Sequence, residues 1–322
     1  MSSNTGYTMT STASYKVGAG SHPTVSINNQ STIVAGWAST ASTNLYCKVG
    51  VFDTGSQEWS WGEQSHYDGG DSASLAINNE NTVVDVHRSS TGSNNLFCRV
   101  GVADTTNKTI VWGGSVEFDA GGTPFVALND NNNVIVVWQS TASTKLYCRA
   151  GIVDPHLRTI TWGPGQQFNA GSHPTVDINN NNTVIIGFAS TSSTKLLYQV
   201  GYLYSDTGLV STAPSVEYDG GDHNDLTIDD ANFVWETHKS SESNTAYYRA
   251  GTLTTNTPVW TINWDQTEYP KQNTEVVRIS MPPLSQSADK LGVSLILNNN
   301  DISVQIWECT PTAVTSAEMA GA

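Results

Sequence analysis

One glycine recurs about every 50 residues along this chain of 322 residues. It stands in the segments "NLYCKVGV", "NLFCRVGV", "KLYCRAGI", "LLYQVGYL" and "AYYRAGTL", as Gly50, Gly101, Gly151, Gly201 and Gly251, at spacings of 51, 50, 50 and 50. Periods of this length are typical of propellers, solenoids and arrays of small modules. The repeat therefore limits the fold more strongly than length or composition does.

The residues inside one repeat indicate strands. In the first repeat, "PTVSI", "TIVAGWAS", "NLYCKVGVFD" and "EWSWGEQSHY" are rich in β-branched and aromatic residues, and short Asn, Gly and Ser clusters separate them. This pattern favours β-strands joined by turns, and it contains no 3.6-residue stripe that would indicate a helical repeat. Four short antiparallel strands in about 50 residues are typical of one blade of a β-propeller.

A longer repeat of 151 residues is superimposed on the shorter one. "AGSHPTVSINNQSTIVAGWAST" begins at Ala19 and "AGSHPTVDINNNNTVIIGFAST" at Ala170, and 15 of the 22 positions are identical. "YDGGD" likewise begins at both Tyr67 and Tyr218. Because 151 residues span three of the shorter repeats, the sequence predicts two copies of a three-blade unit, and therefore six blades in one ring.

The sixth repeat is the least regular one. "TEVVRI" from Thr274 matches "TPFVAL" from Thr123 at the expected distance, but "WECT" at Trp307 comes 18 residues later than "WQST" at Trp138 predicts. Either an insertion of about that length interrupts this blade, or "LGVSLIL" is itself the first strand. In the repeat frame the chain begins where it ends, so the N-terminal "GYTMTSTASYKV" would supply the outer strand, close the ring and hide its edges.

We therefore expect one all-β domain over residues 1–322, a six-bladed β-propeller with four-stranded antiparallel blades and an internal pseudo-twofold duplication. The approximate repeats are 17–67, 67–118, 118–168, 168–218, 218–269, and 269–322 completed by 1–17. If the first strand of each blade runs down from the upper face, the "STAST" and "GSHP" loops share that face and the Asn-rich turns lie below. Binding residues concentrate on loops that a rigid scaffold carries, which favours the upper face.

The net charge limits the classes of binding partner, and the cysteines indicate the cellular compartment. The 29 acidic and 14 basic residues give a net charge of −15, which disfavours nucleic acid and anionic lipid as partners. No apolar run approaches the roughly 20 residues of a membrane span, and "MSSNTGYTMT" lacks the pattern of a secretory signal. We expect no membrane insertion and a cytoplasmic protein, or one released without a leader. Cys47, Cys98 and Cys148 hold one repeated position, which predicts free thiols.

A large ring ends the second strand of each expected blade: Trp37, His87, Trp138, Phe188, His238 and Trp307. Two residues earlier, on the same face of the strand, the second and fifth repeats carry Asp85 and Glu236, whereas the other repeats carry uncharged residues. The sequence therefore predicts two classes of groove between blades, one aromatic and one with a carboxylate and an imidazole.

The candidate ligand-binding residues are these rings and acids together with His22, Ser39 and His173 on the upper loops and Arg99, Arg149 and Arg249 on the third strands. An aromatic ring covers the apolar face of a sugar, and hydroxyl, imidazole or Arg groups bind its hydroxyls. The structural interpretation is that the rings pack between blades and the arginines pair with Asp68, Asp119 or Asp219. Neither acid–His pair has a visible third ligand, so we expect no metal and no cofactor.

The pattern "YDxGxxPxVxxNxxxxVVxVHxS…LYCRVG", spread over repeats one to five, resembles a repeat found in many bacterial proteins. The six-blade plan also resembles the fucose-binding propeller lectins of fungi and bacteria, whose blade motifs differ. The resemblance suggests a multivalent lectin, a hemagglutinin that binds cell-surface glycans, because several weak sites on one ring gain about 10²–10⁴ in avidity. A propeller scaffold for protein partners is the alternative. A glycan-processing enzyme is disfavoured, because the arginines radiate from separate blades and no residues are expected in catalytic roles.

Overall fold

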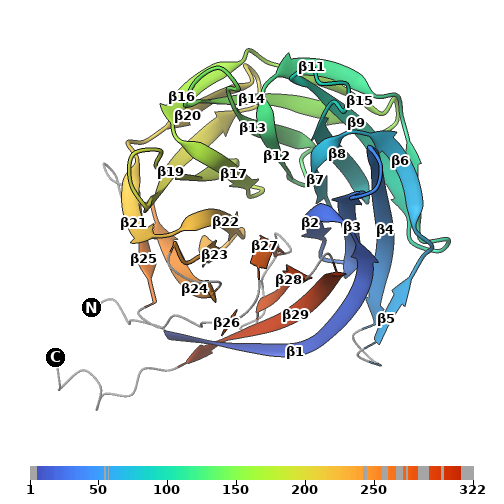
Figure 1. Ribbon diagram of the computed structural model, residues 1–322. Helices are drawn as coiled ribbons and strands as arrows, with labels where there is room; N and C mark the ends of the chain where they lie inside the picture. Colours follow the sequence, from blue (N-terminus) through green and yellow to red (C-terminus); the bar gives the residue numbers. More distant parts are fainter. Residues whose placement is uncertain are drawn as a thin grey trace.

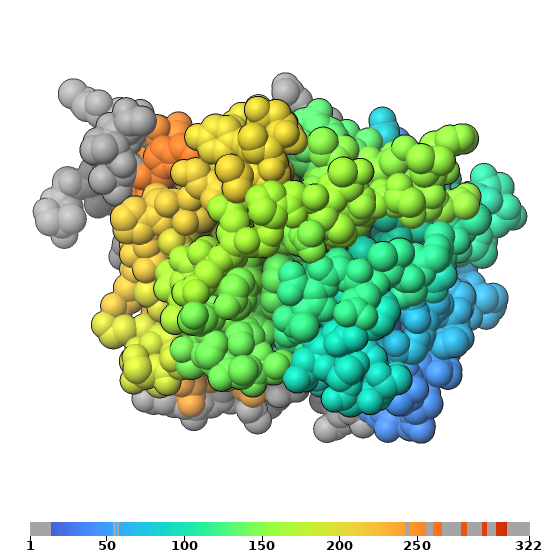
Figure 2. Space-filling view, turned by 90° about the horizontal axis from the view of Figure 1, so that it is seen from above, coloured from blue at the N-terminus to red at the C-terminus, as the bar shows by residue number. Residues whose placement is uncertain are grey.

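The computed structural model describes residues 6–53, 56, 58–241, 245–255, 260–265, 271–272, 275–281, 290–298 and 301–312. Within these ranges, strands form six antiparallel sheets that stand as blades around a central axis (Figure 1). The chain is thus a six-bladed β-propeller, and the prediction from the repeat is confirmed. In a view turned by 90°, successive repeats follow one another around the outside of the ring (Figure 2). The described residues include no helix that could cross a membrane.

The first five blades share one plan. The innermost strands, which line the axis, are β2 (Ser21–Ile27), β7 (Asp71–Ile77), β12 (Gly122–Leu128), β17 (Ser172–Ile178) and β22 (Asp222–Ile228). The second strands are β3 (Thr32–Ala38), β8 (Thr82–Arg88), β13 (Asn133–Gln139), β18 (Thr183–Ala189) and β23 (Phe233–Lys239). The third strands are β4 (Asn44–Asp53), β9 (Asn95–Asp104), β14 (Lys145–Asp154), β19 (Lys195–Tyr204) and β24 (Thr245–Thr254).

The outer strand of these blades is divided in two, which the sequence pattern did not indicate. The segments that pair with the lower half of the third strand are β5 (Glu58–Trp61), β10 (Thr109–Trp112), β15 (Thr159–Trp162), β20 (Leu209–Thr212) and β25 (Thr261–Trp264). The upper segments are β6 (Ser65–Gly69), β11 (Val116–Ala120), β16 (Gln166–Ala170), β21 (Val216–Gly220) and β26 (Lys271–Gln272). The break lets the backbone touch the next blade, because a Cβ added at Gly62 would lie only 2.1 Å from the Lys108 carbonyl oxygen.

The first and the last described strands meet in the sixth blade. β1 (Gly6–Ala19) pairs with β29 (Asp301–Thr312), β29 pairs with β28 (Lys290–Asn298), and β28 pairs with β27 (Glu275–Ser280), the innermost strand (Figure 1). The N-terminal strand is therefore the outer strand of a blade whose inner strands come from the C-terminal part. This confirms the predicted closure of the ring.

Both alternatives that the sequence offered for this blade, an insertion before Trp307 or "LGVSLIL" as the first strand, were wrong. "LGVSLIL" belongs to β28, the second strand, and Trp307 lies on β29, the third, opposite Gly292. The third strand starts at Asp301, 156 residues after Lys145, so the blade is only five residues longer than the repeat. Trp307 is 6% exposed and packs with Trp235 and Tyr248 in a core cluster between blades, so it does not hold the place that Trp138 holds on the second strand of its blade.

Side chains seal the inner edges of the blades. Backbone N–H groups of one innermost strand donate to side-chain oxygens of the preceding blade: Leu75 to Thr24 at 3.0 Å, Val126 to Ser74 at 3.2 Å, Ile228 to Asp177 at 2.8 Å, Ile279 to Asp225 at 2.8 Å, and Ile27 to Ser280 at 3.3 Å. These bonds satisfy strand edges that would otherwise stay open. They also draw the strands together, so that the lower channel holds only about 50 Å³ of space.

The Asn-rich turns form a second set of contacts, at the lower end of the blades. The side-chain oxygen Oδ1 of Asn28 accepts hydrogen bonds from the backbone N–H groups of Gln30 and Thr32, and its side-chain Nδ2 donates to the backbone carbonyl of Asn78 at 3.0 Å. The same amide contact joins Asn78 to Asn129, Asn129 to Asn179, and Asn179 to Asp229. The structure confirms that the runs are turns, and we call this row of contacts the Asn row.

We expect the buried thiols to react only when the protein unfolds. Cys47, Cys98 and Cys148 are buried and free, and burial raises the pKa of Cys47 to about 11 and those of the other two to about 12. The side chain of Cys309 lies outside the described residues. A chromogenic thiol reagent at neutral pH should therefore react slowly with these three in the native protein. In denaturant it should count all four without prior reduction, whereas a count of two would mean a disulfide.

Candidate functional site

The rings that end the second strands are buried between blades. Trp37, Trp138 and Phe188 are 1%, 2% and 1% exposed, and His87 and His238 are 1% and 2% exposed. Trp138 stacks on Tyr147, with ring centres 5.9 Å apart. The expectation of open grooves beside these rings is corrected, because the protein's own side chains fill the space that a sugar would need.

These rings instead shape the start of each first strand. A Cβ added at Gly20 would come within 2.5 Å of Trp37, so only glycine lets the chain pass this ring. Beyond the glycine, Ser21 pairs with Ala38 and Thr24 with Gly36, which leaves His22 and the residue after it as a bulge opposite Trp37. The bulge residue of five blades has a φ of 47–51°: His22, Ser72, Thr123, His173 and His223. Backbone strain of this kind gathers at ligand sites, which directs attention to the bulges.

The five bulges surround a pocket on the axis at the upper face, which we call the axial pocket. Its volume is about 300 Å³, at the lower end of the range for small-molecule sites. The polar side chains that line it are Ser21, His22, Ser72, Thr123, His173, Thr175, His223, Asn224, Lys239 and Arg278. None of the described lining residues is acidic. The pocket is therefore a cationic and polar site in an acidic protein.

Arg278 brings a cation from the sixth blade into the lining of the pocket. It lies on β27 of the sixth blade, and its guanidinium carbon is 4.6 Å from the ring centre of Phe125 on the third blade, so it bridges the axis. Burial raises the pKa of the neighbouring Asp225 to about 7, although the Arg278 cation opposes the shift. The carboxyl of Asp225 thus lies close enough to Arg278 for the two charges to interact.

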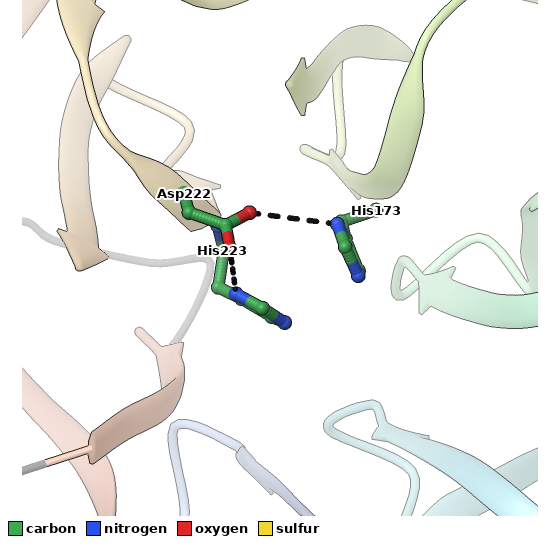
Figure 3. Close-up of side chains that lie close together, drawn as sticks. All are labelled: His173, Asp222 and His223. Atoms are coloured by element: carbon green, nitrogen blue, oxygen red, sulfur yellow. Dashed lines mark hydrogen bonds and ion pairs between the residues drawn. The ribbon is translucent and has the colours of Figure 1, made fainter. Parts of the chain in front are cut away.

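Two histidines and an aspartate meet at the rim of the axial pocket (Figure 3). His173 Nδ1 lies 3.6 Å from one Asp222 oxygen, and His223 Nδ1 lies 2.9 Å from the other. The two imidazole rings are 4.1 Å apart between centres. Burial and the neighbouring His223 lower the pKa of His173, which outweighs the opposing effect of Asp222. We call these three residues the His–Asp–His cluster.

The pocket brings together only two of the residues expected from the sequence, His22 and His173. Reasoning from the sequence missed His223, Asp222, Lys239 and Arg278. The repeat contained a signal for His223, because its position in "GGDHND" corresponds to the histidine of "GSHPT" in the first and fourth repeats. The signal was overlooked because the surrounding letters differ.

The other expected residues have structural contacts outside this pocket. Arg99, Arg149 and Arg249 lie 3.4 Å from Asp68, 3.9 Å from Asp119 and 3.1 Å from Asp219, which confirms the structural interpretation of these arginines. Each also lies over a tryptophan of its own blade, Trp112, Trp162 or Trp264. Ser39 accepts hydrogen bonds from the backbone N–H groups of Ala41 and Ser42 and so caps its own loop.

The acid–His pairs belong to two buried triads. Tyr67 donates to Asp85 at 2.8 Å, and His87 Nδ1 contacts the other Asp85 oxygen at 2.6 Å. Tyr218, Glu236 and His238 repeat this arrangement at 3.1 and 2.9 Å. Asp85 and Glu236 are fully buried, so these groups join neighbouring blades and are closed to a ligand.

No family model and no curated protein matches this chain. The fold is similar to that of several solved structures. An α-L-arabinanase of Penicillium chrysogenum complexed with arabinobiose aligns with a TM-score of 0.60 and 12% identity over 92% of this chain and 98% of its own. A neuraminidase-like protein of A/flat-faced bat/Peru gives 0.56 and 12%, over 96% of this chain and 94% of its own. A putative 6-phosphogluconolactonase of Bacteroides uniformis gives 0.55 and 11%, over 86% and 80%. At this identity the likeness shows the propeller fold alone.

Proposed function

We propose that this protein is a carbohydrate-binding protein that takes one anionic sugar, a sugar acid or a sugar phosphate, in the axial pocket. The observation that carries the proposal is the charge of the lining. Arg278 and Lys239 face a pocket with no acidic residue in its described lining, in a protein whose net charge is −15. Two cations that share one pocket repel each other, and an anion bound between them would relieve that repulsion. The three histidines of the lining add ring nitrogens as hydrogen-bond partners.

The rest of the lining suits a sugar ring. Pro23, Pro124 and Pro174 place three apolar rings at equivalent positions of the first, third and fourth blades. Thr175 is 2% exposed, and its hydroxyl has no hydrogen-bond partner among the described residues. A buried hydroxyl without a partner costs free energy, and a sugar hydroxyl would satisfy it. Apolar surface, a hydroxyl and cations together match the parts of an anionic monosaccharide.

The similar structures support the ligand class in a general way. One is named for an arabinanase with bound arabinobiose, and another for a putative 6-phosphogluconolactonase. A glycan-processing enzyme is therefore the second candidate. We favour binding without turnover, because the described lining offers no pair of carboxylates for acid–base catalysis of glycoside cleavage.

An array of uronates, sialates, sugar phosphates and their neutral counterparts tests the proposal. We expect acidic members to bind and neutral ones not to, and calorimetry with the best ligand to give one site per chain. Lys239→Gln should weaken binding about tenfold, as for the loss of a charge-assisted hydrogen bond. Lys145→Gln removes the same charge from an exposed position outside the pocket and should leave affinity unchanged.

The other outcomes separate the rivals. Several equivalents per chain with no effect of Lys239→Gln would place binding outside the pocket. Breakdown products in the calorimetry cell, detected by mass spectrometry, would favour an enzyme. An array with no bound sugar would favour a scaffold for protein partners.

A further inference from the structure

We propose that the His–Asp–His cluster binds a divalent transition metal ion, and that Zn²⁺ fits its donors best. His173, Asp222 and His223 offer two imidazole nitrogens and one carboxylate oxygen, a donor set that suits Zn²⁺ and leaves a fourth position open. The proposal concerns the metal alone and does not depend on the proposed sugar.

The distances agree with a shared ion. Tetrahedral zinc with bonds of about 2.0–2.1 Å places neighbouring ligand atoms about 3.3 Å apart. One Asp222 oxygen lies 3.6 Å from His173 Nδ1 and the other lies 2.9 Å from His223 Nδ1. With one ligand atom taken from each of the three residues, these atoms lie within 4.8 Å of one another, so small side-chain rotations would bring them to a shared ion. His173 Nδ1 is buried and has no hydrogen-bond partner among the described residues, although a ring nitrogen in that position normally has one. A metal ion would satisfy it.

The backbone holds the donors in place. His173 and His223 are bulge residues of adjacent blades, with φ of 48° and 51°, and the N–H of His223 donates to Asp222 at 2.9 Å. Both rings line the axial pocket (Figure 3). An ion bound here would therefore sit on rigid strands, with its open position available to water or to a ligand oxygen.

The duplicated half of the chain provides an internal comparison. His22 and Asp71 hold the positions of His173 and Asp222, but Ser72 stands where the second copy has His223. Both carboxylate oxygens of Asp71 are also held by Arg88, at 2.9 and 2.7 Å. In the fifth blade Lys239 takes the place of Arg88, and an ammonium lacks the planar fork that holds two oxygens at once. Only one of the two copies therefore offers three donors, which predicts one ion per chain.

The test uses the full chain without an affinity tag, stripped with a chelator and desalted. Calorimetric titration with ZnCl₂ should give one equivalent, and Co²⁺ should show the visible absorption of a four-coordinate site. Asp222→Asn and His223→Ala should each weaken Zn²⁺ binding by about a hundredfold, since loss of a direct ligand costs at least as much as loss of its outer-shell partner. His156→Ala removes an exposed histidine outside the axial pocket and should leave the affinity and stoichiometry of Zn²⁺ binding unchanged.

A gain of binding is the stricter test. Ser72→His combined with Arg88→Lys should raise the stoichiometry from one to two, whereas Arg88→Lys alone should leave it at one. Thermal unfolding without metal establishes that each variant folds. No uptake at about 100 μM Zn²⁺, or uptake unchanged by both loss variants, would overturn the proposal; 100 μM lies far above the dissociation constants of zinc sites. A folded double variant that stays at one equivalent would show that these three residue types are insufficient.

Discussion

A chain that lacks residues 1–17 is expected to lose cooperative unfolding and to aggregate. The deletion removes nearly all of β1, whose pairing with β29 runs from Gly6 to Ala19. The deletion also removes Val17, a core residue that is 3% exposed and packs in the cluster that contains Trp37 and Val304. The exposed edge of β29 would then offer unpaired backbone groups to other chains. Urea unfolding followed by circular dichroism, together with light scattering, measures both effects.

A control variant and a rescue experiment test whether this effect is specific to β1. Lys16→Ala removes an exposed ion pair with Asp301, and such pairs contribute little, so this variant should unfold like the intact protein. A synthetic peptide of residues 1–19, added to the truncated chain, should restore cooperative unfolding. If the truncated chain alone melts like the intact protein, the shared blade does not hold the ring together.

Asp85→Ile is expected to destabilise the protein by about 3–5 kcal/mol, the usual cost of removing one partner from a buried polar pair. The carboxylate is fully buried and bonds both Tyr67 and His87. Its loss leaves a hydroxyl and an imidazole between two blades without their acceptor. Urea unfolding at pH 6 measures the change in the free energy of unfolding.

The interface between the third and fourth blades supplies the matched control. At the positions of Tyr67, Asp85 and His87 it uses Phe168 of the third blade and Ile186 and Phe188 of the fourth, with no polar group among them. The triple variant Tyr67→Phe, Asp85→Ile and His87→Phe should therefore recover most of the lost stability, because a well-packed apolar set replaces a buried polar one at little cost. A triple variant as unstable as Asp85→Ile would contradict this account of the interface.

The stabilisation by the buried triad should depend on pH. Burial opposes a charge on the His87 ring, but the carboxylates of Asp85 and Asp68 outweigh it and raise the pKa of His87 above its ordinary value. The native state therefore binds a proton more tightly than the unfolded state does. The resulting stabilisation is fully present below the ordinary pKa of 6.5 and is lost as the pH rises through the raised value. Between pH 6.5 and the raised pKa of His87, the free energy of unfolding of the wild type should therefore fall relative to that of the triple variant, which lacks His87.

The blade plan could be predicted because its determinants are local. Strand patterns, Asn turns and the recurring glycines lie within each 50-residue unit, and the ring follows from repeating it. Closure by the N-terminal strand was right even though the alignment of Trp307 was wrong. That alignment failed because a tryptophan is needed between the fifth and sixth blades on a different strand from the one that carries Trp138.

The site was harder to predict for a physical reason. Alternation along β13 shows which face Trp138 occupies, but not that the neighbouring blade closes over it and leaves it 2% exposed. The axial pocket, in contrast, gathers residues about 50 positions apart that have nothing in common except their place in the repeat. Aligning the repeats by the bulge position brings His22, His173 and His223 together. Arg278 would still be missed, because the sixth repeat lacks the surrounding motif.

The Asn row bears on how such a ring acquires its number of blades. From Asn28 to Asn179, each turn donates the same side-chain amide to the same backbone carbonyl of the turn that follows, and Asp229 is the last acceptor. Because these contacts are the same at each junction between blades, they do not determine how many blades the ring has. A whole repeat inserted between the second and third blades would find a suitable donor on one side and a suitable acceptor on the other. The pairing of β1 with β29, which closes the ring, therefore limits the number of blades to six. Gain or loss of one repeat would leave the contacts of the Asn row intact. It would change the axial pocket, because residues from several blades line that pocket together.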